Sequence, residues 1–143
     1  MIGNANVIED LNRLLEIEYR SFPMYLADAS PWTTQHDESA GEALKNIVAD
    51  QQAISQRIGE LILQLGGRIA PGEYPMEFTD THFLSLEYLL KELLGYQRQD
   101  VADIGQIVSR LAGHREAQEL AEEALGAERA HLEAIEALQA QPA

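Results

Sequence analysis

The chain has 143 residues, of which 45% are hydrophobic and 24% charged, a composition typical of one globular domain spanning residues 1–143. It contains no cysteine, which excludes disulfides, thiolate metal sites and cysteine nucleophiles. The formal net charge of −14 argues against binding to nucleic acid or anionic membranes, because the chain has no basic stripe to meet their phosphates.

The N-terminal residues carry no targeting pattern. Residues 1–6 lack the basic run and apolar block of a secretory signal. No stretch is long and apolar enough to cross a bilayer. We therefore expect a cytoplasmic protein that has neither nucleic acid nor a membrane as a partner.

Apolar residues spaced three and four apart predict four long amphipathic helices, at about 7–29, 35–65, 81–111 and 115–138. Pro23 falls inside the first helix and should kink it or end it early; we expect the kink, because the residues after it are too apolar for a loop. The pair Gly66-Gly67 predicts the end of the second helix, and Gly113 separates the third from the fourth.

The connections between these helices predict their directions. Short links make the first and second helices, and the third and fourth, antiparallel neighbours. Segment 68–79 contains Pro71, Gly72 and Pro75 and can extend over about 40 Å, on the order of the length of the second helix. We expect it to cross over the length of an all-α four-helix bundle, so that the chain runs up-down-down-up.

Each apolar seam is interrupted near its middle by polar residues. Burying such groups costs free energy unless they pair with one another or hold a metal ion. A polar layer across four helices is therefore a metal site, the remains of one, or a hydrogen-bonded layer. The interrupting residues are Glu18, Gln51, Gln97, and Glu128 with His131.

These residues match part of a known metal-binding pattern. Di-iron and di-manganese bundles take one Glu from each of two helices and a Glu-x-x-His pair from each of the others. The stretches LNRLLEIEYRSFPMYLADA and ADQQAISQRIGELILQLGG, with the fourth helix, resemble bacterioferritins and the wider ferritin-like superfamily, which includes rubrerythrin-type bundles. The resemblance implies a ferritin-like bundle over the whole chain, with Glu18, Glu128 and His131 at metal-ligand positions.

The other three ligand positions that the resemblance implies are changed. They fall on Gln51, Ile54 and Gln97, and the haem-ligating Met of bacterioferritins falls on Gln52, so we expect no haem. A change from Glu to Gln keeps hydrogen bonding and removes charge. We therefore expect a layer without a metal cofactor, in which a protonated His131 offsets one carboxylate and the glutamine amides donate to the carboxylates.

The alternative is a surviving site for one iron or another divalent cation. Two carboxylates and one imidazole, from Glu18, Glu128 and His131, are ligand types that non-haem iron accepts. Asp100 lies one turn beyond Gln97 and would take part if the register of the third helix were different. The protein would then be an iron-dependent oxidoreductase.

We favour a non-catalytic or much altered member of the superfamily that acts as an oligomeric structural or binding protein. The apolar stripe of the third helix, from Phe83 to Tyr96, is wider than one bundle seam needs. Either segment 68–79 or a second subunit covers the surplus. We expect a homo-oligomer, at least a dimer.

Overall fold

The protein is all-α in a computed structural model that describes residues 3–29, 38–81 and 86–140, and these ranges contain no strand. The predicted all-α class is thus confirmed. The predicted helix start at residue 35 lies outside the described ranges. Residues 82–85, which follow the predicted helix start at residue 81, lie outside them as well. The elements are α1 (Gly3–Tyr19), α2 (Phe22–Ala29), α3 (Glu38–Gln64), the 3-10 helix η1 (Met76–Thr81), α4 (Leu86–Arg110) and α5 (Arg115–Ala140).

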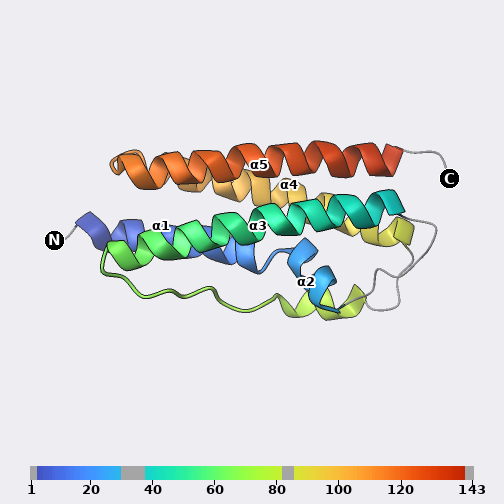
Figure 1. The fold of residues 1–143 in the computed structure, drawn as a ribbon, viewed down its shortest axis with the longest axis horizontal. Helices are drawn as coiled ribbons and strands as arrows, with labels where there is room; N and C mark the ends of the chain where they lie inside the picture. Colours follow the sequence, from blue (N-terminus) through green and yellow to red (C-terminus); the bar gives the residue numbers. More distant parts are fainter. Residues whose placement is uncertain (1–2, 30–37, 82–85, 141–143) are drawn as a thin grey trace.

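The four long helices α1, α3, α4 and α5 lie along the long axis of the molecule (Figure 1). Following the colours from blue to red, α1 and α5 run in one direction, and α3 and α4 run in the other. The segment between α3 and η1 returns along the molecule, so that α4 starts near the end where α3 started. No helix among the described residues is long and apolar enough to cross a membrane.

The predicted kink at Pro23 is a full break between α1 and α2. Helix α1 ends at Tyr19, and Ser21 caps α2, because its Oγ accepts a hydrogen bond from the backbone N of Met24 at 3.2 Å. Pro23 lies in the first turn of α2, where its missing N–H costs nothing. The expected single helix over 7–29 is therefore wrong, since this serine cap begins a new helix.

The segment that follows α3 lies against α1. Asn12 binds it twice, with Nδ2 donating to the backbone oxygen of Arg68 at 2.9 Å and Oδ1 accepting from the nitrogen of Ala70 at 2.7 Å. Further along, Arg20 Nε donates to the backbone oxygen of Gly72 at 2.8 Å. These bonds hold an irregular segment in one path along the molecule.

The interior consists of two apolar clusters separated along the helix axes. The first takes residues from α1, α3, α4 and α5: Leu11, Leu14, Leu15, Ile17, Ile54, Ile58, Leu61, Ile62, Ile104, Ile107, Leu111, Ala117, Leu120, Ala121, Ala124 and Leu125. The second takes residues from α2, α3, η1, α4 and α5: Phe22, Leu26, Leu44, Ile47, Phe78, Leu89, Leu90, Leu93, Leu94 and Ile135.

The wide apolar stripe of the third predicted helix is covered in part within the chain, and Tyr88 stays 46% exposed. The leucines at the start of α4, from Leu89 to Leu94, are buried in the second cluster with Phe22 and Phe78. Phe78 belongs to η1 and packs against Phe22 in a tilted arrangement, with ring centroids 4.9 Å apart. The segment that ends in η1, one of the two expected coverings, therefore covers part of the stripe. Phe83 lies outside the described residues.

Candidate functional site

A layer of buried polar side chains separates the two apolar clusters. None of its five members is more than 6% exposed. In α3, α4 and α5 they lie between a residue of the first cluster and a residue of the second, and Glu18 lies near the end of α1, between Ile17 of the first cluster and Phe22 of the second. The prediction that these residues face the interior is confirmed, because a helix that buries one stripe also buries the polar positions within it. The members are Glu18, Gln51, Gln97, Glu128 and His131.

The carboxylate of Glu128 is the centre of the layer. Gln51 Nε2 donates to its Oε2 at 3.1 Å, and Gln97 Nε2 donates to its Oε1 at 2.7 Å. The predicted donation by both glutamine amides is thus present. Ile54, at the third changed ligand position, is buried in the first apolar cluster and offers no polar atom.

His131 lies between two carboxylates. Its Nδ1 is 2.7 Å from Glu128 Oε1, and its Nε2 is 2.8 Å from Asp50 Oδ2. Because ionised carboxylates only accept, both ring nitrogens must carry hydrogen, and the ring is an imidazolium. Burial lowers the pKa of His131, but hydrogen bonds to Glu128 and Asp50, with their charges, outweigh burial and raise that pKa above its ordinary value.

Glu18 and Glu128 form a coupled pair that holds one negative charge. Burial first, and the charge of Glu128 second, raise the pKa of Glu18 well above its ordinary value. The protonated form of Glu18 is therefore favoured, and in that form its carboxyl group can donate to Glu128. Burial alone would raise the pKa of Glu128, but hydrogen bonds from His131, Glu18 and Gln97 outweigh it and hold the pKa below its ordinary value. The imidazolium balances this one charge.

Two further residues complete the layer, and our reading of the sequence missed both. The hydroxyl of Ser21 donates to Gln51 Oε1 at 2.7 Å. Ser21 lies at the break between α1 and α2, where helical periodicity gives no signal. Asp50 binds His131 from the surface, and its side chain is 58% exposed. An exposed residue does not interrupt the apolar seam of its helix, so the periodicity of the sequence could not indicate Asp50.

The register of the third predicted helix is settled by contact. Gln97 reaches Glu128, whereas Asp100 lies beside the layer, in a cavity of about 350 Å³ that is also lined by Arg13 and Ser21. Burial, and then the charge of Glu128, raise the pKa of Asp100 to about 8. Asp100 is thus a neighbour of the layer, and its protonation state depends on the charge of Glu128 within that layer.

The residues of the layer do not fit a metal ion in this arrangement. A ligand must direct a lone pair at the ion, but Gln51 and Gln97 direct N–H groups at Glu128, and both nitrogens of His131 carry hydrogen. Within the described ranges, no group of three or more His, Asp or Glu side chains could hold a metal.

Comparison of the sequence with protein-family models found no match, and comparison with curated proteins found none either. The ferritin-like resemblance, and the ligand roles that it implies, therefore stay predictions from the sequence.

Proposed function

We propose that this chain is a ferritin-like, up-down-down-up four-helix bundle in which a metal-free hydrogen-bonded layer replaces the metal site. Its proposed role is that of an oligomeric structural or binding protein, without catalysis. The opposed directions of neighbouring long helices and the long return segment between α3 and η1 support the bundle type. This proposal differs from that of a metal-dependent enzyme in the charge of the buried layer around Glu128.

The observation that carries the proposal is the set of donors around Glu128. Its two carboxylate oxygens receive hydrogen bonds from Gln51, Gln97 and His131. Bonds to a charged acceptor contribute more than neutral ones, so the buried carboxylate is stabilised without a cation. A metal ion would have to displace these donors. Layers of this kind give a helical core one defined packing arrangement, which suits a structural role.

One observation favours the competing function, an iron-dependent oxidoreductase. When Glu18 is ionised, neither of its oxygens has a donor among the described residues, and Gln97 Oε1 has none either. These three oxygens are acceptors of the kind that a hard cation takes. Loss of the protons on Glu18 and His131 would leave two carboxylates and one imidazole for a single iron.

Metal content decides between the two functions. The protein is purified without chelator and analysed for iron, manganese and zinc, before and after incubation with iron(II) under nitrogen. We expect far less than one ion per chain in both samples. Near-stoichiometric metal in either sample overturns the proposed layer and supports the oxidoreductase.

A restored ligand set tests the geometry of the layer. The triple change Gln51→Glu, Ile54→His and Gln97→Glu puts metal-ligand side chains at all three changed positions and should create metal binding. The matched control places the same chemistry at exposed positions of the same helices, with Gln64→Glu, Ala53→His and Gln99→Glu. Metal binding by the control, or by neither protein, contradicts the assignment of these positions.

A further inference from the structure

A cavity of about 350 Å³ lies beside the buried layer, where α1 ends and α2 begins. Its walls come from this break, from the return segment with η1, and from the second half of α4. Ser21, which bonds to Gln51 of the layer, forms part of the wall, so the cavity adjoins the layer. Cavities that hold small molecules measure roughly 300–1,000 Å³. The volume therefore suits a small molecule with about one ring.

Three aromatic rings from three elements meet in the wall of the cavity. Phe22 of α2, Phe78 of η1 and Tyr96 of α4 all line it. The ring centroid of Tyr96 is 5.0 Å from that of Phe22 and 5.0 Å from that of Phe78. Such rings offer apolar surface, and the faces of aromatic rings also attract cations. The rings therefore favour a ligand that combines an apolar body with positive charge.

Acidic residues outnumber basic ones around the cavity. Among the residues that the structure describes, five acids and two bases line it: Glu16, Glu73, Glu77, Asp100 and Asp103, with Arg13 and Arg20. An excess of carboxylates repels anionic ligands and attracts cations.

Both arginines of the cavity are already engaged by the protein. Arg13 donates to Glu16 Oε1 at 2.8 Å and lies 3.5 Å from Asp103 Oδ2. Arg20 donates to the backbone oxygen of Gly72 at 2.8 Å. These contacts direct the two guanidinium groups at the protein itself, so the arginines do not offset the remaining carboxylates.

The remaining carboxylates are those of Glu73, Glu77 and Asp100, which make no ion pair or hydrogen bond with a described residue. Of these three, only Asp100 is partly buried. It follows Tyr96 by four residues in α4, so the two side chains lie on one face of the helix. Burial, and then the charge of Glu128, raise the pKa of Asp100 to about 8, because no cation of the protein stabilises its ionised form enough.

We propose that this cavity binds a small organic ammonium ion, whose charged nitrogen pairs with Asp100 and whose apolar body packs on Phe22, Phe78 and Tyr96. An arylalkylamine has both parts, since a short alkyl chain joins its ring to its nitrogen. This binding site goes beyond the structural role proposed above. It depends neither on the oligomer nor on the metal content of the buried layer.

Binding of an ammonium ion should release a proton from Asp100. A nearby positive charge lowers the pKa of an acid. Since the pKa of free Asp100 is about 8, most copies carry the proton at pH 7 and lose it when the ligand binds. The charged and titratable groups around Asp100 are Tyr96 and Asp103 of α4, Glu128 of α5, Arg13, Glu16 and Glu18 of α1, Arg20, Glu73 and Glu77.

Titration calorimetry of the full chain with phenethylamine at pH 7 tests the site. A ligand of this size that fits its cavity should have a dissociation constant below about 1 mM. Titrations in phosphate and in Tris, which differ in ionisation enthalpy, should show release of close to one proton per ligand. Phenethyl alcohol lacks the charge and ethylamine lacks the ring, so each should bind about tenfold more weakly or worse.

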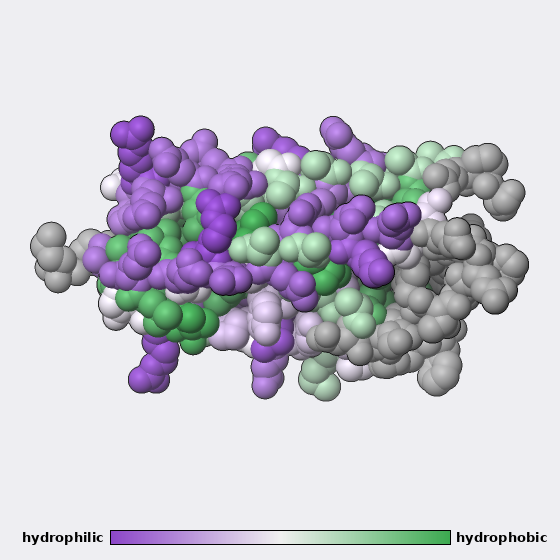
Figure 2. Space-filling model, viewed as in Figure 1, coloured by the Kyte–Doolittle hydropathy of each residue, from purple (hydrophilic) through white to green (hydrophobic). Residues whose placement is uncertain are grey.

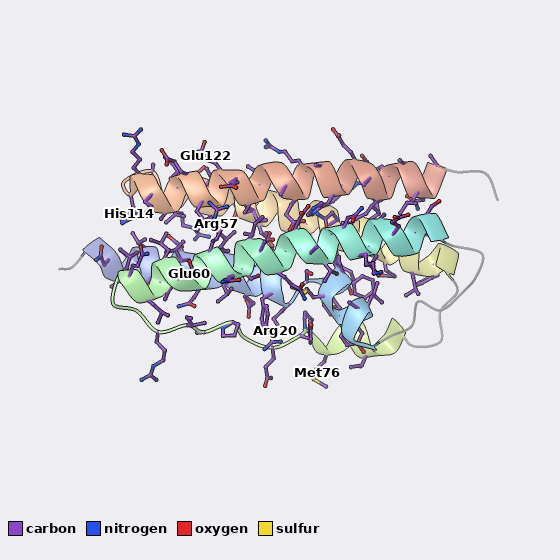
Figure 3. All side chains as sticks on the ribbon, in the orientation of Figure 1. Arg20, Arg57, Glu60, Met76, His114 and Glu122 are labelled. Carbon is purple, nitrogen blue, oxygen red and sulfur yellow. The ribbon has the colours of Figure 1, made fainter. Side chains whose placement is uncertain are left out.

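Asp100→Asn tests the residue that pairs with the ligand. The variant should raise the dissociation constant of phenethylamine by about tenfold or more and abolish the proton release. The matched control is Glu122→Gln, which also removes one of the negative charges of the chain. Figure 3 shows Glu122 on the outer side of α5, at the opposite edge of the molecule from Arg20 of the cavity. Figure 2 shows hydrophilic side chains over this first half of α5, and we expect the control to bind like the natural protein.

Three outcomes would overturn the ammonium site. The first is no binding of phenethylamine at concentrations up to about 10 mM, well above the expected dissociation constant. The second is binding of ethylamine as tight as that of phenethylamine, which would leave the rings without a role. The third is an equal loss of affinity in Asp100→Asn and Glu122→Gln, which would show general attraction to a chain of net charge −14. None of these outcomes bears on the metal-free layer, which elemental analysis tests alone.

Discussion

Gln97 is bonded to Glu128 twice, with its Nε2 2.7 Å from the carboxylate Oε1 and 3.0 Å from the backbone oxygen. This pair joins α4 to α5 within the buried layer. Both bonds need an N–H on residue 97, which glutamate lacks. The pair therefore determines how many negative charges the layer can hold.

Gln97→Glu should destabilise the protein strongly at neutral pH. It replaces two donors with an anion against Glu128, and a buried, unpaired charge costs about 3 kcal/mol of the free energy of unfolding. Urea unfolding measures the loss. Gln64→Glu, the same change at an exposed position, should cost less than about 0.5 kcal/mol. Equal stability of the two variants would show that residue 97 does not contact Glu128 in solution.

His131 should be protonated at neutral pH. Its pKa lies above the ordinary 6.5, so its contribution to stability is complete below that pH and is lost as the pH rises through the folded-state pKa. A titration of the ring by nuclear magnetic resonance should have its midpoint above 6.5. Asp50→Asn removes one of its two carboxylate partners and should lower that midpoint. A midpoint below 6.5 in the natural protein contradicts the imidazolium.

Asp100→Asn should stabilise the protein in a pH-dependent way. The raised pKa of Asp100 means that stability is complete below pH 3.8 and is lost as the pH rises from there to about 8. Asparagine cannot ionise, so the variant should gain roughly 1–2 kcal/mol at pH 8, a modest figure because the side chain is partly exposed. At pH 3.5 the two proteins should unfold at the same urea concentration. A gain that persists in acid would show a cause other than ionisation.

Two glycines should respond to alanine in opposite directions. Gly72 has φ +71°, and a Cβ there would collide with the carboxylate of Glu16, so Gly72→Ala should cost about 1–2 kcal/mol of stability. Gly95 lies in α4 with nothing within 4 Å of an added Cβ, so Gly95→Ala should add roughly 0.5–1 kcal/mol. Thermal unfolding measures both. A stabilising Gly72→Ala would show that the return segment takes another path.

The all-α class and the buried positions were determined by the sequence itself. Helical periodicity is a local property, since residues three and four apart share a face whatever lies opposite them. The five interruptions of the seams could therefore be found, and each of them is buried. The break before α2 was missed, because the cap formed by Ser21 and Pro23 is weaker as a pattern than the apolar residues around it.

The partners of those residues were decided by tertiary structure alone. Periodicity places Glu128 and His131 in the interior, but it contains nothing about which side chain of another helix reaches them. That depends on the axial register of α3 and α4 against α5, which packing sets over the whole length of the helices. The register of α4 places Gln97, rather than Asp100, against Glu128. The register of α3 places the exposed Asp50 against His131. The protonation of the layer follows from those contacts, because a carboxylate or an imidazole takes its charge from its neighbours.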